Sequence, residues 1–402
     1  MAEGDRLGFI VSLLGNSRSN SPHQRMNIVH IFPYSARMPG GHSNAIREFI
    51  ACQRGAGLRV LGLSPATLEE FPNARELGAV IEEIDFTAPG TVMERITRWA
   101  DPQPTILHLH AINRFATDLA SRAKGAGMRV AMTSHGQLNY RNPLHAIKKF
   151  LYLGACRTPV RYAHGIHVLT HKERQQLRLL LPTYGGVIAT IPHVIHDAGL
   201  DGDRDTGPRS RESLADKPFT ILHLGRLDVV TKGLDLLVEG FAKSGLNQAR
   251  LVLAGPDWNH GRAALEHLAN NLGCAGRVDF PGAAYGADKE RLFASADLFV
   301  AASRWDAFNI SLAEALLRGI PAVVSDHLNL APELARANAV QVVPCSANAF
   351  AKGIGEVSKD PIHRKAMACR GKEWVLNHCS GNRVSAGFLT FYKQLLKFSP
   401  SP

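Results

Sequence analysis

Short apolar runs alternate along the chain with longer segments whose apolar residues recur at helical spacing. Strands separated by helical segments of about ten or more residues predict βαβ units and a parallel sheet. The polar segment 201–217 divides this pattern into two series. The predicted strands are 28–32, 59–63, 105–109, 129–133, 165–169 and 187–191, and then 220–224, 250–254, 278–280, 298–301, 322–325 and 339–343. We therefore expect an α/β fold with two Rossmann-like, doubly wound parallel-sheet domains that face a deep cleft.

The length of 402 residues agrees with two domains. We expect a disordered leader over 1–25, because its one apolar stretch is short and no small-residue cleavage site follows it. The other predicted boundaries are a first domain over 26–200, a linker over 201–217, a second domain over 218–382, and a helix over 383–402 that crosses back to the first domain.

The composition indicates which cellular location and which kinds of partner suit the protein. No apolar run reaches the length of about 18 residues that a membrane-spanning helix needs. The six cysteines are scattered without a CxxC pair, which favours a reducing, cytoplasmic location. The 46 basic residues exceed the 35 acidic ones by 11. Such a surplus attracts an anionic partner, which is a nucleic acid, a membrane surface or a phosphorylated ligand.

A phosphate-binding constellation follows the first strand of the second series. Gly225 and Arg226 come directly after strand 220–224, and Lys232 precedes a helix that we expect to begin near Gly233. A glycine lets the backbone approach a ligand, two cations suit a diphosphate, and a helix N-terminus adds amide donors. Taken alone, the two cations are better interpreted as solvated loop charges.

A second constellation follows strand 298–301. Asp306 and Glu314 lie eight positions apart and bracket a loop and the start of a helix, and Arg-Gly-Ile-Pro and strand 322–325 come next. Carboxylates suit the vicinal hydroxyls of a ribose or hexose. The loop residues Ala307, Phe308 and Asn309 are expected to turn their backbone amides toward the same crevice. An acidic pair alone is a weak signal, whereas this succession of elements is specific.

These segments resemble the family 4 retaining glycosyltransferases of the GT-B fold, of the type found in bacterial polysaccharide and lipopolysaccharide synthesis. The resemblance runs from about residue 28 to 396 and is strongest at 219–237 and 295–334. It implies that Arg226 and Lys232 hold the diphosphate of a nucleotide sugar. The family's paired acidic element falls on Asp306 and Glu314.

The same resemblance implies that Glu314 binds the nucleotide ribose, while Asp306 and the amides of residues 307–309 bind the donor sugar. Gly255 matches a family loop that borders the nucleotide base. This chain departs from the pattern at two of these positions. Asp306 is one methylene shorter than the usual glutamate, and Ala307 replaces a glycine, so the turn must avoid a positive φ or adopt it under strain.

The first domain supplies a histidine and a glycine-rich loop. His135 follows strand 129–133 and precedes a glycine, which places it at a strand's carboxyl end. The resemblance implies that His135 binds the donor sugar or the acceptor near the anomeric carbon, and a core histidine is the alternative. Gly40 and Gly41 fall in the family's first glycine-rich loop, where amides approach the diphosphate or acceptor; a structural tight turn is the alternative. Pro192-His193-Val194 replaces the family's Pro-Asn-Gly.

We expect no metal site and no cofactor other than the nucleotide-sugar donor. His108 and His110 share one face of a strand, but no third ligand stands at a useful spacing. The segment 201–203 imitates a DxD metal motif, yet it lies in the polar linker and is read as solvated charge. Arg226 and Lys232 would then stabilise the leaving diphosphate electrostatically.

The function predicted from the sequence is a retaining transfer of a sugar to a glycan or lipid-linked acceptor in cell-surface polysaccharide synthesis. Two alternatives remain within the fold: an epimerase-like enzyme, and a non-catalytic sugar-nucleotide binder. A nucleic-acid-binding protein is the third, suggested by charge alone. Because no helix-turn-helix, zinc-finger or RNP pattern supports it, we expect no nucleic-acid partner.

The positive charge is concentrated in the first domain. Residues 122–178 hold eleven basic residues and one acidic residue, so 11 − 1 = +10. Our hypothesis is that this surface, with the apolar Ile147, Phe150, Leu151 and Tyr152, docks peripherally on anionic lipid at the inner face of the plasma membrane, where a lipid-diphosphate acceptor is found. Ordinary solvated charge is the alternative.

Overall fold

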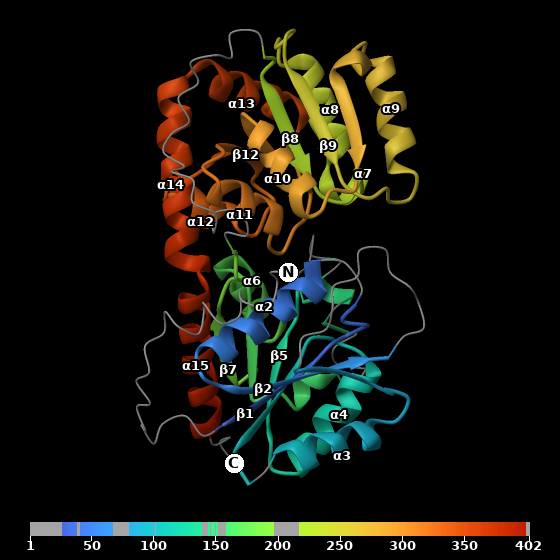
Figure 1. The fold of residues 1–402 in the computed structure, drawn as a ribbon, viewed down its shortest axis with the longest axis vertical. Coiled ribbons are helices and arrows are strands. Elements are labelled where there is room, and N and C mark those ends of the chain that lie inside the picture. The colour runs from blue at the N-terminus through green and yellow to red at the C-terminus, as the bar shows by residue number, and fades with distance from the viewer. Residues whose placement is uncertain are drawn as a thin grey trace, which may run out of the picture.

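The protein folds into two α/β domains, one above the other in Figure 1. This computed structural model describes residues 26–37, 41–66, 80–100, 102–138, 144, 146–148, 150–151, 158–196 and 217–398. The strands are β1 (Asn27–Ile31), β2 (Arg59–Pro65), β3 (Ile81–Ile84), β4 (Thr105–Leu109), β5 (Arg129–Thr133), β6 (Gly165–Val168), β7 (Val187–Thr190), β8 (Thr220–Leu224), β9 (Arg250–Ala254), β10 (Val278–Gly282), β11 (Leu298–Ala301), β12 (Ala322–Ser325) and β13 (Gln341–Val343).

Helices lie in most of the connections between these strands, and the last helices of the chain follow β13. The helices are α2 (Gly41–Gly55), α3 (Pro89–Ala100), α4 (Arg114–Gly125), α6 (His171–Leu180), α7 (Val229–Lys232), α8 (Leu234–Lys243), α9 (Gly261–Asn271), α10 (Gly286–Ser295), α11 (Ile310–Leu317), α12 (Ala331–Arg336), α13 (Ala347–Lys359), α14 (Pro361–Cys379) and α15 (Gly381–Lys397), with short 3-10 turns at Pro159–Arg161 and Ala275–Arg277.

Each domain is built on one parallel sheet. The first has the strand order β3-β2-β1-β4-β5-β6-β7 and the second β10-β9-β8-β11-β12-β13. The central strands β1, β4, β8 and β11 are buried along their whole length, as expected for a sheet covered on both faces by helices. The predicted GT-B architecture of two doubly wound parallel-sheet domains is therefore confirmed.

The direction of winding reverses between β1 and β4 in the first domain and between β8 and β11 in the second. Ligands of doubly wound sheets bind at such switch points, outside the carboxyl ends of the strands. The two predicted donor-binding segments follow β8 and β11. The topology thus brings them together from positions about 80 residues apart.

The chain returns to the first domain at its end. Figure 1 shows α14 running down one side of the second domain and α15 continuing beside α2 and β7. A Cβ atom on Gly165 would lie 2.5 Å from Leu395 and 2.6 Å from Phe391, so only glycine on β6 lets α15 approach the sheet this closely. Tyr392 and Phe388 of α15 are fully buried in the first domain.

The differences from the predicted elements are local. We missed β3, an edge strand with the sequence Ile-Glu-Glu-Ile that is half-buried along its length and therefore lacks a strong apolar pattern. The last strand is shorter than predicted, and a helical turn, α7, precedes the helix expected at Gly233. Residues 1–25 and 201–216 lie outside the described ranges. Among the residues that the structure describes, no helix is long and apolar enough to cross a membrane.

Candidate functional site

Two glycine loops pack on each other at the carboxyl end of β8. Gly225 donates its N–H to the Ala254 carbonyl at 2.9 Å, and Gly255 donates to the Gly282 carbonyl at 2.8 Å. Gly255 has a φ of 151°, and a Cβ there would lie 1.8 Å from the Gly225 oxygen. No other residue fits this position without moving the backbone. The two predicted glycines therefore shape one loop surface.

Arg226 lies at the boundary between the domains. Its guanidinium stacks over the Trp258 ring, 4.4 Å from the centroid. Its charge also acts on two side chains of the first domain. Burial raises the pKa of Tyr34 and Arg226 opposes this rise, whereas burial lowers the pKa of His42 and Arg226 lowers it further. Arg226 is thus held by an aromatic face from its own domain and directed toward the opposite one.

Lys232 and Asp306 form an ion pair. The Lys232 Nζ lies 2.7 Å from Asp306 Oδ2, and the two side chains are 18% and 10% exposed. Lys232 ends α7, and Gly233 then takes a left-handed conformation in which a Cβ would lie 2.2 Å from the Ala302 carbonyl oxygen. The close approach of this turn to the end of β11 places the lysine against the aspartate.

The loop after β11 is built without strain. Ala307 does not have a positive φ, so the alternative in which this turn is strained is wrong. Asn309 caps α11 by accepting the Leu312 N–H at 2.9 Å, and its amide donates to Asp306 Oδ2 at 3.2 Å. Phe308 is buried, with the His193 ring edge-on at 5.0 Å between centroids. The Asn309 cap and the Asp306 carboxylate thus hold each other in position.

Glu314 lies on α11 and pairs with a lysine that the sequence reasoning missed. Lys289 Nζ of α10 is 2.7 Å from Glu314 Oε1, and the side chains are 25% and 18% exposed. Both predicted carboxylates therefore hold a cation. A ligand that binds either carboxylate through hydroxyl groups must share it with its lysine.

The first domain reaches this site through His135 and Gly136. Both residues have positive φ, 44° and 83°. A Cβ on Gly136 would lie 2.7 Å from the Ala307 Cβ, so this turn touches the predicted donor-sugar loop directly. Gly41, the first residue of α2, lies near Ile310, since a Cβ on it would be 3.7 Å from that side chain. Gly40 lies outside the described ranges.

A buried carboxylate supports the His135 turn from behind. Glu173 accepts hydrogen bonds from the Ser134 hydroxyl and from the Leu169 N–H, both at 2.7 Å. Thr170 caps the same helix, α6, by accepting the Glu173 N–H at 3.1 Å. Because Glu173 is fully buried, these bonds lie in a medium of low polarity, where they are strong.

The His135 ring is neutral and lies among other histidines. Burial, reinforced by the nearby His42 and His193, holds its pKa well below the usual range. Its Nε2 lies 2.9 Å from His110 Nδ1. Its Nδ1 makes no hydrogen bond to any described residue. His42 hydrogen-bonds Tyr34 and the backbone of His135, which connects the ring to the start of α2.

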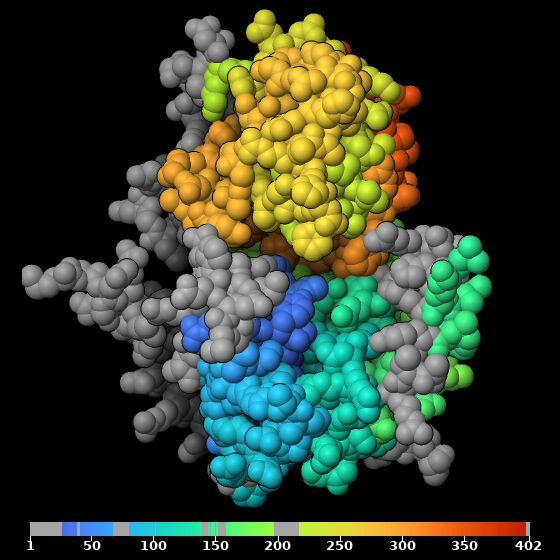
Figure 2. Space-filling model, turned by 90° about the vertical axis from the view of Figure 1, so that its right-hand side faces the viewer, coloured from blue at the N-terminus to red at the C-terminus, as the bar shows by residue number. Residues whose placement is uncertain are grey.

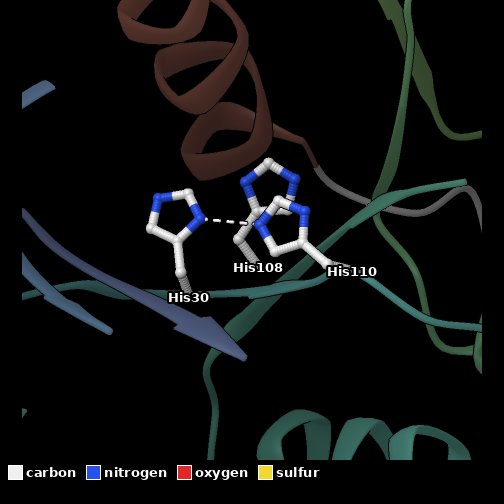
Figure 3. Close-up of side chains that lie close together, drawn as sticks. All are labelled: His30, His108 and His110. Carbon is white, nitrogen blue, oxygen red and sulfur yellow. Dashed lines mark hydrogen bonds between the residues drawn. The ribbon is translucent and has the colours of Figure 1, made fainter. Parts of the chain in front are cut away.

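Three histidines form the one group within the described ranges whose spacing suits a metal ion. Ligand atoms of His30, His108 and His110 lie within 4.8 Å of one another. Figure 3 shows the three rings side by side, with His30 on β1 and the others at β4. The expectation that His108 and His110 have no third partner was wrong, because the register pairs His30 with His108. All six nitrogens nevertheless have protein hydrogen-bond partners.

The domains contact each other beside the site. The His171 N–H at the start of α6 donates to Glu333 at 2.8 Å, and Lys172 donates to the Asp326 carbonyl at 3.2 Å. Figure 2 shows the two domains as lobes that meet across the middle of the molecule. The contacts of Gly136 with Ala307 and of His193 with Phe308 lie across the same boundary.

An apolar cavity of about 190 Å³ opens at the switch point of the first domain. Ile31 and Leu109, at the ends of β1 and β4, line it together with Phe86 and Phe115, whose rings stack at 4.7 Å. His110 also lines it. The cavity and the His135 turn are therefore joined by one side chain.

Comparison with known proteins agrees with this arrangement. The family model described as Glycosyl transferases group 1 matches residues 208–374. An uncharacterized glycosyltransferase of Methanocaldococcus jannaschii is 29% identical over 49% of this chain and 50% of its own length, so the match spans half of that relative. The phosphatidyl-myo-inositol mannosyltransferase of Mycolicibacterium smegmatis is 26% identical over 92% of this chain and 94% of its own length.

Solved structures show the same fold across nearly the whole chain. Sucrose-phosphate synthase from Thermosynechococcus elongatus matches with a TM-score of 0.72 and 19% identity, covering 93% of this chain and 100% of that one. Anabaena HepE in complex with UDP-glucose matches with a TM-score of 0.68 and 18% identity, covering 92% and 100%. The chain therefore has the two-domain GT-B fold, and over residues 208–374 it is similar to the group 1 glycosyl transferases, in agreement with the family 4 resemblance of its sequence.

Proposed function

We propose that this protein is a retaining glycosyltransferase that needs no metal ion and transfers a sugar from a nucleotide-diphosphate sugar to a glycan or lipid-linked acceptor. The observation that carries the proposal is the convergence of Arg226, Lys232 and Asp306 at the β8/β11 switch point, with the His135–Gly136 turn packed against Ala307. A structural neighbour solved with UDP-glucose supports the choice of donor class.

The roles of the second-domain residues follow from their charge and place. Arg226 and Lys232 supply positive charge to the diphosphate as it leaves, which in a partly dry site is worth about 3–4 kcal/mol for a well-placed group. Glu314 accepts hydrogen bonds from the ribose hydroxyls. Asp306 and the amides at the start of α11 bind hydroxyls of the donor sugar.

Retention then follows a front-face course. The acceptor hydroxyl attacks from the side on which the diphosphate departs, and a phosphate oxygen takes its proton. No carboxylate is needed as a covalent nucleophile, in contrast to retaining glycosidases. His135 lies at the boundary where donor sugar and acceptor meet, so its ring orients one or both.

The acceptor side includes a basic and apolar surface on the first domain. Leu144, Ile147, Phe150 and Leu151 are all more than half exposed, and Lys148 lies between them. Tyr152 lies outside the described ranges. The name of the mycobacterial relative specifies a lipid acceptor, phosphatidyl-myo-inositol. We infer that this surface rests on anionic lipid. Liposome flotation tests it: binding rises with anionic lipid content and falls with salt, and an Ile147→Ser/Phe150→Ser variant stays in solution.

A labelled-donor assay separates the proposal from its rivals. UDP-, GDP-, ADP- and CMP-sugars are offered with glycan and lipid acceptors, and products are analysed for linkage and anomeric configuration. Sugar transfer with retention, about 10²–10³-fold weaker in Lys232→Ala and kept in Lys243→Ala, is the expected result. Epimerised sugar without transfer supports the epimerase-like alternative. Donor binding without any turnover supports the non-catalytic binder.

A further inference from the structure

A continuous series of eight hydrogen bonds connects His135 to the backbone carbonyl of Ile191 through the core of the first domain. Its members come from five strands or their ends and from two helices, α2 and α15. In order, they are His135, His110, His30, Gln53, Tyr392, His108, Thr133, His167 and Ile191. We call this series the relay.

The direction of every bond in the relay is set at its far end. A carbonyl oxygen only accepts, so His167 Nε2 must carry the proton in its 2.6 Å bond to Ile191. The ring is neutral, because burial lowers the pKa of His167 to about 4. Its Nδ1 therefore accepts, and the Thr133 hydroxyl donates to it at 2.8 Å.

The same logic passes through the C-terminal helix. Thr133 has spent its one proton, so it accepts from His108 Nε2 at 2.7 Å. His108 Nδ1 then accepts from the Tyr392 hydroxyl at 2.7 Å. Tyr392 in turn accepts from the Gln53 amide at 3.2 Å, which turns the Gln53 carbonyl oxygen toward His30.

The remaining bonds carry this direction to the cleft. His30 Nε2 donates to Gln53 at 2.9 Å, and burial lowers the pKa of His30 to about 4. Its Nδ1 accepts from His110 Nε2 at 2.8 Å, and His110 Nδ1 accepts from His135 Nε2 at 2.9 Å. His135 Nδ1 is left as a buried nitrogen with a lone pair and no partner among the described residues.

We propose that the relay holds His135 as the Nε2–H tautomer, so that its Nδ1 accepts a hydrogen bond from a hydroxyl of the bound sugar and cannot donate one. The ligand class, a sugar, rests on the proposed function; the tautomer does not. Tyr392, Thr133, His108 and His110 are positioning residues that act through His135. The C-terminal helix thereby fixes the polarity of a histidine at the domain boundary.

The metal alternative is the direct competitor of this proposal. An ion on His30, His108 and His110 would take lone pairs from nitrogens that the relay assigns as protonated or engaged. The relay leaves no such lone pair free within the cluster. The metal content of the purified protein is therefore a second, independent test of the proton positions assigned to the relay.

The test is nuclear magnetic resonance of the full chain with ¹⁵N-labelled histidine, without any sugar added. Long-range proton–nitrogen spectra distinguish the two neutral tautomers, and His135→Asn identifies the His135 signals. We expect a protonated Nε2 and an unprotonated Nδ1 at neutral pH. In Tyr392→Phe and Thr133→Val, which break the relay, we expect a mixture of tautomers. Thr133→Ser keeps the hydroxyl and the single tautomer, and Tyr184→Phe, at a half-buried tyrosine outside the relay, also leaves the tautomer unchanged.

Kinetics give a second reading. Thr133→Val is expected to lower kcat of sugar transfer about tenfold with little change in KM, and Thr133→Ser to restore kcat to within about twofold of the natural enzyme. An Nδ1–H tautomer in the natural protein, or a single Nε2–H tautomer that persists in both relay variants, overturns the proposal. So does stoichiometric zinc in the purified protein that is lost in His30→Gln. If the tautomer is as expected and no sugar is transferred, the proposed function fails and the relay stands.

Discussion

The Lys232–Asp306 pair gives the most quantitative prediction. Replacing Lys232 with alanine leaves the Asp306 carboxylate, 10% exposed, with one hydrogen bond from the described residues, donated by Asn309. Breaking a buried ion pair costs about 3–5 kcal/mol. Because both side chains keep some exposure and Asn309 still donates, we expect a loss of about 2–3 kcal/mol in the free energy of unfolding. For a domain of this size, that lowers Tm by roughly 5–10 °C.

Activity and stability are expected to separate in the double variant. Lys232→Ala should lower kcat/KM about 10²–10³-fold, because a positive charge on the leaving diphosphate is lost. Lys232→Ala/Asp306→Asn removes the uncompensated charge as well, so it should recover about 1–2 kcal/mol of stability and none of the activity. Thermal and urea denaturation with labelled-donor kinetics measure both quantities.

The matched control lies on the next helix. Lys243 is half-exposed, 3.9 Å from Glu239, and its replacement by alanine should change stability by less than about 0.5 kcal/mol. If Lys232→Ala unfolds at the same temperature as the natural protein, or if the two substitutions lower stability additively, the argument from an uncompensated buried charge is wrong.

Three further outcomes are expected. Gly255→Ala should lower the free energy of unfolding by about 3 kcal/mol or more, because the new Cβ would lie 1.8 Å from the Gly225 oxygen. An unchanged urea midpoint contradicts the close packing of the Gly225 and Gly255 loops. Glu173→Gln should lower the free energy of unfolding by about 2 kcal/mol and lower kcat, since the bond to the Ser134 hydroxyl or the bond to the Leu169 N–H is lost; equal Tm and kcat would count against it. Stability should also decrease as the pH is lowered. The pKa of His30 is about 4 folded and 6.5 unfolded, so its contribution is complete above pH 6.5 and shrinks by about 2 kcal/mol by pH 5; a flat urea midpoint from pH 7.5 to 5 refutes this.

Much of the fold could be predicted because the central strands are buried on both faces. Runs such as Thr105–Leu109 and Thr220–Leu224 are apolar apart from a first threonine and one histidine each, and segments with helical periodicity separate such runs. β3 escaped prediction because an edge strand with two glutamates carries little of this signal. Strand order cannot be read from hydrophobicity, and it depends on the winding of the chain.

The residues of the site that could be predicted are those that directly follow predicted strands. Arg226 and Asp306 were expected at one crevice because each follows the carboxyl end of a predicted parallel strand and the resemblance assigns both to the donor. The structure shows that these strands, β8 and β11, are neighbours at the switch point. The partner of each carboxylate was not foreseen, since Lys232 and Asp306 are 74 residues apart and side-chain conformation decides the contact. The relay was hidden for a related reason. His30 meets His108 only through the register of β1 on β4.

The central claim is that Arg226 and Lys232 bind the diphosphate of a nucleotide sugar. Calorimetric titration of a panel of UDP-, GDP-, ADP- and CMP-sugars into the natural protein, Lys243→Ala and Arg226→Ala/Lys232→Ala tests it most directly. The account predicts that at least one donor binds the natural protein and Lys243→Ala equally well, and binds the double variant at least 100-fold more weakly. Equal affinity for all three proteins, or no binding of any donor to the natural protein, would contradict it.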